Sequence, residues 1–316
     1  MRIFLAGGTG VIGVRALPAL VAAGHQVTAV ARTEKKADLV RRLGGTPVAV
    51  DLFDRDAVVA AVADAVDSQG AVVNLATNIP PVTKSAKATA WATNDRIRTQ
   101  GSTHLVDAAL AARAATYVQE SICFPYVDGG DEWITESHPV QHEGPFSGAA
   151  AAEANAARFA EASASGGTGV VLRFTQFYAP DASHTQFYNA SLRKRLNPFI
   201  GPPNAYQSWI HADDAASAVV AALAVPSGTY NICDDEPLTR QQAGRAAALS
   251  LGVKPPHALP RLVQAATPSS AKLMMKSLRV SNQRFAEATG WAPQYPSIRG
   301  NWPGDGAIPD QTAGTT

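Results

Sequence analysis

The sequence predicts an α/β fold in which a doubly wound, mostly parallel sheet is joined to a smaller C-terminal lobe. Short apolar runs with the length of buried strands alternate with stretches whose apolar residues recur at helical spacing. A glycine-rich turn separates the first expected strand, 2–6, from the first expected helix, 14–23. The chain has 316 residues and can bury a large core. Alternating strands and helices of this kind give a parallel sheet with helices on both faces.

The glycine-rich turn predicts a dinucleotide site. Gly7 permits a tight turn out of the strand, and Gly10 removes a Cβ where a pyrophosphate must approach the backbone. Gly13 lets the helix pack closely on the strand. The free N–H groups and the dipole of the helix start then bind the phosphates. We expect the cofactor to be held here by Gly7, Thr9, Gly10, Val11, Ile12 and Gly13.

The spacing G-x-x-G-x-x-G, with Thr9 between the glycines, resembles the short-chain dehydrogenase/reductase superfamily, and more narrowly its extended branch, the NAD-dependent epimerase/dehydratase family. The segment 207–223 resembles the family's S-W-I-H-V-D-D-x-A motif, in which Asp213 or Asp214 is expected to cap the next helix. The segment 277–291 resembles the family's closing segment. The resemblance extends to about Trp302.

The resemblance implies two lobes with the substrate between them. A dinucleotide-binding Rossmann domain is expected over 1–175, with returning strands near 207–234. A substrate lobe is expected from 176–206 and 235–302. We expect 303–316, which is rich in Gly and Thr, to be a disordered tail.

The residue after the second expected strand, 25–32, favours NADP over NAD. An acid at this place would bond the 2′-hydroxyl of NAD. The chain instead has Arg32, followed by Lys35 and Lys36, and Arg32 could pair with a 2′-phosphate. NAD stays possible, because a solvated basic loop is the alternative reading of these residues.

The resemblance implies further cofactor contacts. Asp51, followed by Leu52, stands where the family places an Asp against the adenine amino group; the alternative is that Asp51 caps the next turn. Ala76 lies in a segment that looks like the family's N-x-A-A turn, where backbone passes under the cofactor. Asn94 matches a structural Asn that braces the active site, with an exposed polar helix residue as the alternative.

The end of the fifth expected strand, 116–124, should contribute to the chemistry. Ser121 matches the family's hydroxyl residue that bonds the substrate oxygen. Glu120 stands where a small hydroxyl residue is usual. It could act as a general base, with a pKa raised by desolvation. It could equally point away from the pocket and pair with a surface Lys or Arg, because neighbours on a strand alternate faces.

The next helix lacks the family's Tyr-x-x-x-Lys pair. In the family, the Tyr transfers a proton and the Lys holds the nicotinamide ribose, and a spacing of four puts both on one helix face. Here Phe146 stands at the Tyr position, in the cofactor site, and Ala150 at the Lys position. None of the seven tyrosines has Lys four residues later. General acid–base catalysis is typically worth about 10²- to 10⁴-fold, so the standard mechanism is doubtful.

Side chains in nearby loops are candidates for a substitute proton donor, because these loops follow the carboxyl ends of strands, where ligands bind. His has a suitable pKa at neutral pH. We take His142 and Tyr178 as catalytic candidates beside Ser121 and Glu120. Each alone is also explained as an ordinary loop residue, as are the further candidates Tyr126, His138, Glu143 and His184.

Composition excludes several partners. A net charge of +1 gives no reason to expect nucleic acid or an anionic membrane. No apolar run reaches 18 residues, and no basic leader precedes the first strand, so a cytoplasmic protein is expected. Two cysteines are too few for a structural zinc site, and we expect no metal. A homodimer through the helices near 91–112 and 146–165 is what the resemblance implies.

Three functions remain open. The first is an NADP-dependent oxidoreductase acting on a small carbonyl or alcohol, in which Ser121 orients the oxygen and a non-standard group gives the proton. The second is a redox-neutral isomerase, cyclase or lyase on the same fold, with Glu120 or a loop histidine as base. The third is a non-catalytic NADP-binding sensor. All three follow from a cofactor half that is intact and a catalytic pair that is missing.

Overall fold

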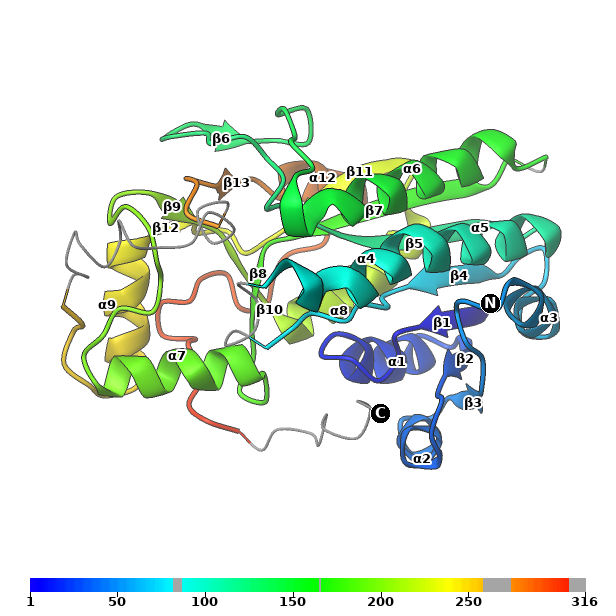
Figure 1. The fold of residues 1–316 in the computed structure, drawn as a ribbon, viewed down its shortest axis with the longest axis horizontal. Coiled ribbons are helices and arrows are strands. Elements are labelled where there is room, and N and C mark those ends of the chain that lie inside the picture. The colour runs from blue at the N-terminus through cyan, green and yellow to red at the C-terminus, as the bar shows by residue number, and fades with distance from the viewer. Residues whose placement is uncertain (82–86, 165, 258–273, 307–316) are drawn as a thin grey trace.

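The computed structural model describes residues 1–81, 87–164, 166–257 and 274–306. Its centre is a seven-stranded sheet in the order β11-β7-β5-β4-β1-β2-β3 (Figure 1). Every neighbouring pair in this sheet is parallel. The strands are β1 (Arg2–Ala6), β2 (Gln26–Val30), β3 (Thr46–Val48), β4 (Ala71–Asn74), β5 (Thr116–Ile122), β7 (Thr168–Phe174) and β11 (Gly228–Ile232).

The strand order confirms the doubly wound prediction. From β1 the chain first adds β2 and β3 on one side, and then adds β4, β5, β7 and β11 on the other. The direction therefore reverses between β1 and β4. In open parallel sheets, ligands bind in the crevice at the carboxyl ends of the strands beside such a reversal.

Helices cover both faces of the sheet, and side chains alternate between the two cores. Ile3 and Leu5 of β1 enter one core, and Phe4 and Ala6 enter the other. The first core is closed by α1 (Gly13–Ala22), α2 (Glu34–Arg42), α8 (Ala212–Ala221) and α12 (Gln283–Thr289). The second is closed by α3 (Arg55–Ala65), α5 (Ser102–Ala111) and α6 (Ser147–Ala162).

The long helix expected over 91–112 is interrupted. α4 (Ala92–Arg96) leads into a π-helical segment, Ile97–Gly101, before α5 begins. Such π segments are rare and often occur at functional sites. This one turns Arg98 inward, where only 2% of the residue is exposed.

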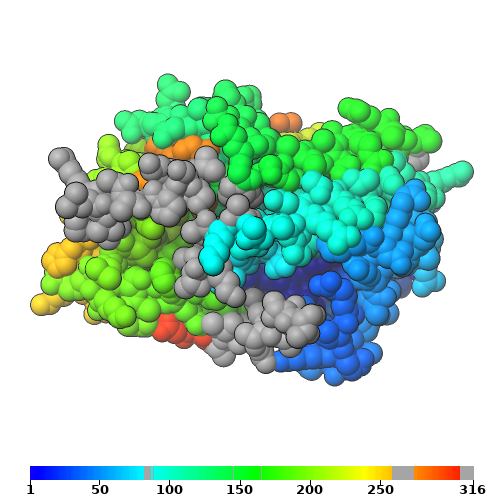
Figure 2. Space-filling view, in the orientation of Figure 1, coloured from blue at the N-terminus to red at the C-terminus, as the bar shows by residue number. Residues whose placement is uncertain are grey.

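Helices α7 and α9 of the expected substrate lobe lie at one end of the molecule (Figure 1), whereas α12, which was also expected there, packs on the central sheet. In Figure 2 the blue-to-cyan N-terminal residues occupy the opposite end of the visible face. Tyr178, Trp209 and Trp302 belong to a separate aromatic core of this lobe. The elements outside the central sheet's two cores are α7 (Ser183–Arg193), α9 (Arg240–Ser250) and three strand pairs: β8 (Gln176–Tyr178) with β10 (Trp209–His211), β9 (Tyr206–Gln207) with β12 (Leu238–Thr239), and β6 (Trp133–Ile134) with β13 (Arg279–Val280). The last pair belongs to a separate small core with Cys123 and Cys233.

The expectation of disorder is wrong for residues 303–306. Asn189 Nδ2 on α7 donates to Asp305 Oδ1 at 2.8 Å, and Arg193 Nη1 forms an ion pair with Asp305 Oδ2 at 2.7 Å. Composition alone indicates a tail here, but it does not show that one carboxylate finds two donors on a helix. The rest of the expected tail, 307–316, lies outside the described residues.

Two negative findings apply to the described part of the chain. No helix in it is both long and apolar enough to cross a membrane. No group of three or more His, Cys, Asp or Glu side chains in it is placed to hold a metal ion.

Candidate cofactor and active site

The turn after β1 accepts only glycine at two positions. Gly7 has φ +84°, and a Cβ on it would lie 2.4 Å from the backbone carbonyl carbon of Leu75. A Cβ on Gly13 would lie 2.1 Å from the carbonyl oxygen of Gly7. Gly10 differs, because it is exposed and a Cβ there would meet only Gly7 O, at 3.4 Å. Gly7 and Gly13 therefore shape the turn, and Gly10 leaves its outer side open, as a bound pyrophosphate requires.

The start of α1 is open to an anion. Ile12 is the N-cap residue, and no side chain caps the helix. The first turn contains no acidic residue. Uncapped N–H groups and the helix dipole favour a phosphate at such a helix start. The turn and the helix together therefore fit the diphosphate of a dinucleotide, with Thr9, Val11 and Ile12 along its path.

Two buried asparagines fix the turn after β4 beside these glycines. Asn74 Oδ1 accepts a hydrogen bond from the Ala76 N–H at 3.1 Å, and its Nδ2 donates to Gln119 Oε1 at 3.0 Å. Asn94 on α4 is 1% exposed, and its Oδ1 accepts from the Asn78 N–H at 3.0 Å. Asn94 is therefore a buried brace of this turn and not an exposed polar residue.

Arg32 follows β2 and is exposed. The structure gives its guanidinium no bonded partner among the residues it describes. The next residue, Thr33, caps α2 by accepting a hydrogen bond from the Lys36 N–H. The arginine is thus placed at the end of β2 with its charge available, and its contact with a 2′-phosphate stays a prediction.

Asp51 stabilises the turn before α3. Its Oδ1 accepts from the Phe53 N–H at 3.1 Å, whereas Asp54 is the N-cap that accepts from Ala57. Leu52 is partly buried and packs against the second core. The local structure therefore fits the alternative that Asp51 caps a turn. Its contact with the adenine stays a prediction.

Glu120 is paired inside the protein. Arg98 Nη2, from the π-helical segment, lies 2.8 Å from both carboxylate oxygens of Glu120. The two side chains are only 2% and 4% exposed. Burial raises the pKa of Glu120, while the Arg98 charge opposes that rise. Neither expected arrangement is found, because the carboxylate is neither free in a pocket nor paired with a surface cation. Base catalysis by Glu120 would require breaking a buried ion pair.

Ser121 is bonded to α6. It is fully buried, and its Oγ donates to Glu153 Oε1 at 2.6 Å. Glu153 also accepts from Arg173 on β7, through Nε at 2.9 Å and Nη2 at 2.6 Å. The hydroxyl proton is thus committed to Glu153, and direct contact between Ser121 and a substrate stays a prediction.

Glu153 links Ser121 and His142, two of the four catalytic candidates, and it was not itself predicted as a site residue. Its position held a usable signal, since it follows Phe146 by seven residues and therefore lies on the same face of a helix. What the sequence could not show is that strands β5 and β7 place Ser121 and Arg173 against that face.

His142 lies beside this cluster. Its Nε2 is 4.0 Å from Glu153 Oε2, and it finds no hydrogen-bond partner in the described structure. Burial lowers the pKa of His142, against the raising effect of Glu153, and the Arg173 charge lowers it further. The imidazole is therefore neutral at pH 7 and faces a carboxylate that could orient it.

Tyr178 belongs to a different part of the molecule. It lies on β8, where its ring stacks on Trp302 at a centroid distance of 5.7 Å and meets His211 edge-on at 5.0 Å. Its hydroxyl is buried and finds no partner among the described residues, and burial raises its pKa well above the usual range. The structure brings Ser121 and His142 together at Glu153, but it places Tyr178 in the aromatic core of the substrate lobe.

The start of α6 is apolar where the family's pair should stand. Phe146 is 3% exposed and stacks on Phe124 with ring centroids 5.8 Å apart. Ala149 and Ala150 precede Glu153 by four and three residues, so they occupy the helix face that leads back from it toward the start of the helix. This face offers neither a phenol nor an ammonium group.

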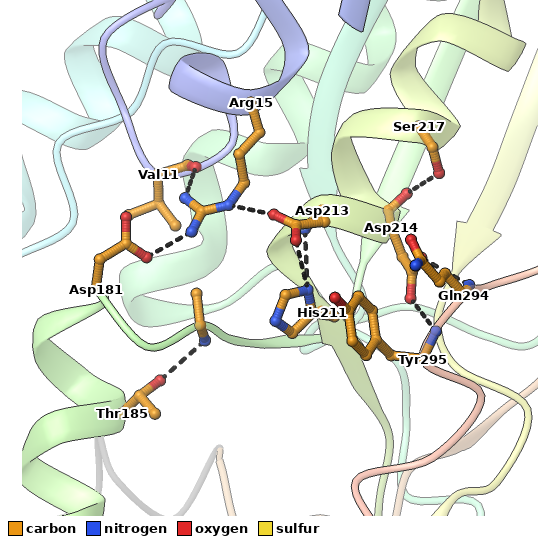
Figure 3. Close-up of polar contacts among 11 residues, drawn as sticks. Val11, Arg15, Asp181, Thr185, His211, Asp213, Asp214, Ser217, Gln294 and Tyr295 are labelled. Atoms are coloured by element: carbon orange, nitrogen blue, oxygen red, sulfur yellow. Dashed lines mark hydrogen bonds and ion pairs between the residues drawn. The ribbon is translucent and has the colours of Figure 1, made fainter. Parts of the chain in front are cut away.

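A charged cluster ties the glycine turn to the substrate lobe (Figure 3). Arg15 on α1 lies 2.6 Å from Asp181, which precedes α7, and 2.6 Å from Asp213 at the start of α8. Its Nη1 donates to the carbonyl oxygen of Val11, within the glycine turn, at 3.0 Å. One guanidinium therefore connects the cofactor turn with α8 of the first core and with Asp181, in the segment expected to belong to the substrate lobe.

The expected cap of α8 is wrong. His211 is the N-cap, and its Nδ1 accepts from the Asp213 N–H at 3.2 Å. The Asp213 carboxylate instead pairs with Arg15, and that of Asp214 accepts from the N–H groups of Gln294 and Tyr295 (Figure 3). Because the carboxylates of Asp213 and Asp214 bind partners that are distant in sequence, the His211 imidazole caps the helix instead.

Comparison with known proteins identifies the family. The model of the NAD dependent epimerase/dehydratase family matches residues 3–233. The chain belongs to this family. A 3-diazoavenalumate denitrifying reductase from Streptomyces sp is 33% identical over 311 residues, covering 95% of this chain and 98% of the relative. A 4-hydroxy-2-methyl-3-oxo-4-farnesyl-3,4-dihydroquinoline-1-oxide ketoreductase from Stigmatella aurantiaca is 30% identical over 245 residues, covering 75% of this chain and 70% of the relative.

Solved structures share the fold at low identity. UDP-glucose 4-epimerase from Thermotoga maritima superposes with a TM-score of 0.75 at 18% identity, covering 96% of this chain and 97% of that one. A human epimerase family protein with NADPH has a TM-score of 0.74 at 22% identity, covering 96% and 98%. The family and the reductase relatives make the chain an enzyme of a family that binds nicotinamide cofactors, which disfavours the non-catalytic sensor.

Proposed function

We propose that this protein is an NAD(P)H-dependent reductase that removes a diazo group from a small organic substrate and releases dinitrogen. The observation that carries the proposal is the apolar start of α6, where Phe146 and alanines replace the proton-donating pair. The relative named as a denitrifying reductase, which aligns with 95% of this chain, points the same way.

The proposed reaction needs no proton from the protein. When bound, NAD(P)H supplies a hydride. Reduction of a ketone creates an alkoxide, so a proton donor contributes about 10²- to 10⁴-fold to such reactions. In a diazonium cation the ring carbon accepts the hydride, the C–N bond breaks and neutral N₂ leaves, so no oxyanion forms. The stacked rings of Phe124 and Phe146 would exclude water from this electrophile.

NADPH is the proposed form of the cofactor. Support comes from the exposed Arg32 at the end of β2, because a guanidinium suits a 2′-phosphate. The glycine turn, Asp51, Leu52, Ala76 and Asn94 would hold the remainder of the dinucleotide. Structural neighbours include complexes with NADPH and with NAD, so NAD is the alternative to exclude.

The test measures where the hydride goes. The enzyme is supplied with benzenediazonium tetrafluoroborate and NADPH deuterated at either face of C4. We expect one face to deliver deuterium to the ring carbon, with N₂ formed in equal amount to the NADPH consumed and no label from D₂O. NADPH oxidation that does not exceed the enzyme-free rate would overturn the proposal. Turnover without any NADPH oxidation would favour the redox-neutral alternative.

Carbonyl reduction is the second candidate, because the half-buried His142 lies beside Glu153 and the second relative is named a ketoreductase. Since burial lowers the pKa of His142, its acid form is favoured only at pH values below the usual histidine range. Acetophenone reduction should then slow as pH rises through this range, and His142→Asn should cost about 10²- to 10⁴-fold. A wild-type rate in the variant would exclude this donor.

A further inference from the structure

The first residue of α9, Arg240, is a buried cation that forms no ion pair with any residue the structure describes. It is 2% exposed. Its Nη2 donates to the carbonyl oxygens of Met274 at 2.8 Å and Lys276 at 3.0 Å. Nε and Nη1 are also buried, yet within the described structure they find no hydrogen-bond partner. Within the described part of the chain, two of the five N–H groups are used, and the three on Nε and Nη1 have no acceptor.

No carboxylate nearby neutralises this charge. Burial lowers the pKa of Arg240 to about 10, and Asp128 is the acid that opposes this effect. Both Asp128 oxygens are engaged elsewhere, because Oδ1 accepts from the Gly130 N–H at 2.9 Å and Oδ2 accepts from the Ser277 N–H at 3.2 Å. Native proteins rarely bury an unpaired charge, and they do so most often at functional sites.

The surrounding sequence is basic over a long stretch. Between Glu236 and Glu287 there is no Asp or Glu at all, so this stretch cannot supply a counter-ion. The chain as a whole has a net charge of only +1, which makes the imbalance local. The same stretch contains eight basic residues: Arg240, Arg245, Lys254, Arg261, Lys272, Lys276, Arg279 and Arg284.

A second cation connects Arg240 with the catalytic end of the sheet. Lys276 is partly buried, and its Nζ donates to the carbonyl oxygen of Tyr126 at 2.5 Å. Tyr126 follows β5, and Glu143, whose charge acts on Lys276, precedes Phe146. Lys276 thus touches Arg240 through its backbone and the loop after β5 through its ammonium group.

We propose that Arg240 and Lys276 form an anion-binding subsite of the substrate lobe that takes a carboxylate carried by the substrate. The ligand would supply the acceptor that Arg240 Nε and Nη1 lack, and a charged acceptor gives the stronger hydrogen bond. The reacting carbon would lie toward the end of β5 and the start of α6, so the substrate is elongated. This inference rests on the proposed function only for where the reacting carbon of the substrate lies.

The experiment measures binding without turnover. The probes are 4-hydroxycinnamate and its methyl ester, which differ in charge and contain no diazo group. Affinities are measured by calorimetry in the presence of NADP⁺. We expect wild type to bind the acid at least tenfold more tightly than the ester, and salt to weaken the acid alone. Equal affinity for both probes, or no binding of the acid, would overturn the proposal.

Variants assign the residues. Arg240→Gln should lose the preference for the acid and keep the ester affinity. Arg245→Gln is the matched control, because Arg245 is an exposed residue on the same helix and should leave both affinities unchanged. An equal loss of both affinities in Arg240→Gln would mean a structural role and would overturn the proposal. If that variant does not fold, Lys276→Gln tests the same preference.

The two proposals fail separately. If the protein prefers the acid but does not reduce a diazonium salt, the subsite is supported and only the proposed reaction is refuted. A protein that reduces the salt but binds acid and ester alike loses only the subsite.

Discussion

The geometry of the cofactor half of this protein is set by backbone, whereas that of the catalytic half is set by side chains. At the end of β1 the geometry is set by backbone, where Gly7 and Gly13 leave no room for a Cβ. At the ends of β5 and β7 it is set by side chains, in the chain of contacts from Ser121 through Glu153 to Arg173. Main-chain geometry tolerates few substitutions, whereas side-chain chemistry can be replaced within an intact fold. The cofactor can therefore be inferred from the family, but the reaction must be argued from the site.

Two substitutions within the glycine turn separate its shape from its binding of the nucleotide. Gly13→Ala puts a Cβ 2.1 Å from Gly7 O, and overpacking of this kind costs roughly 1–3 kcal/mol or more. Gly10→Ala meets only Gly7 O at 3.4 Å, so it should fold normally and lose nucleotide affinity. Thermal unfolding with and without NADP⁺ distinguishes the two. A Gly10→Ala protein with wild-type nucleotide affinity would contradict the role given to this glycine.

The next effect probes the buried charges of the catalytic half. Glu120→Ala leaves Arg98 buried and unpaired, which should lower the free energy of unfolding by about 3–5 kcal/mol. The double change Arg98→Met with Glu120→Leu should restore most of this loss, because no charge remains buried. Urea unfolding provides the measurement. Glu161→Ala, at an exposed site on α6, is the control and should change stability by less than about 0.5 kcal/mol.

A smaller effect is expected at the end of β11. Asp234 is 1% exposed, and both carboxylate oxygens lack a partner among the described residues. Burial raises its pKa well above the usual range, and Asp235 and Glu236 add to the rise. The folded state thus keeps a proton that the unfolded state loses, so stability falls as pH rises above about 3.9 toward the folded pKa.

Asp234→Asn removes this dependence. Its stability relative to wild type should grow as pH rises from 4 to 8, because the amide has no proton to lose on unfolding. Asp235→Asn, at an exposed neighbour, is the control. Parallel stability curves for wild type and Asp234→Asn would show that this carboxyl titrates alike in both states.

The smallest effect tests cofactor choice. Arg32→Glu should weaken NADP⁺ binding about tenfold, or about 1.4 kcal/mol, and leave NAD⁺ affinity nearly unchanged. Arg42→Glu makes the same change of net charge at the end of α2 and serves as control. If Arg32→Glu weakens both cofactors equally, the arginine does not read the 2′-phosphate.

Local patterns predicted the fold and the glycine turn, because both depend on neighbours in sequence. Partner choice was not predictable in the same way. Ser121 bonds Glu153, which lies 32 residues further along the chain. Asp213 was expected to cap α8 but pairs with Arg15, which is 198 residues away in sequence. The π-helical segment that turns Arg98 inward was also missed, because 91–112 was interpreted as one regular helix and a single wider turn shifts the apolar pattern by only one residue.

The position of Trp302 has a consequence for how the protein is made. This ring closes the aromatic core on Tyr178 and Trp209, and its Nε1 donates to Asn189 at 2.7 Å. Ribosomes produce the N-terminal segments first, at roughly 5–20 residues per second. The aromatic faces of β8 and β10 therefore emerge and wait uncovered until residue 302 has been translated. During that interval the ring of Tyr178 lacks the partner that stacks on it, whereas the strands around the glycine turn can already pair.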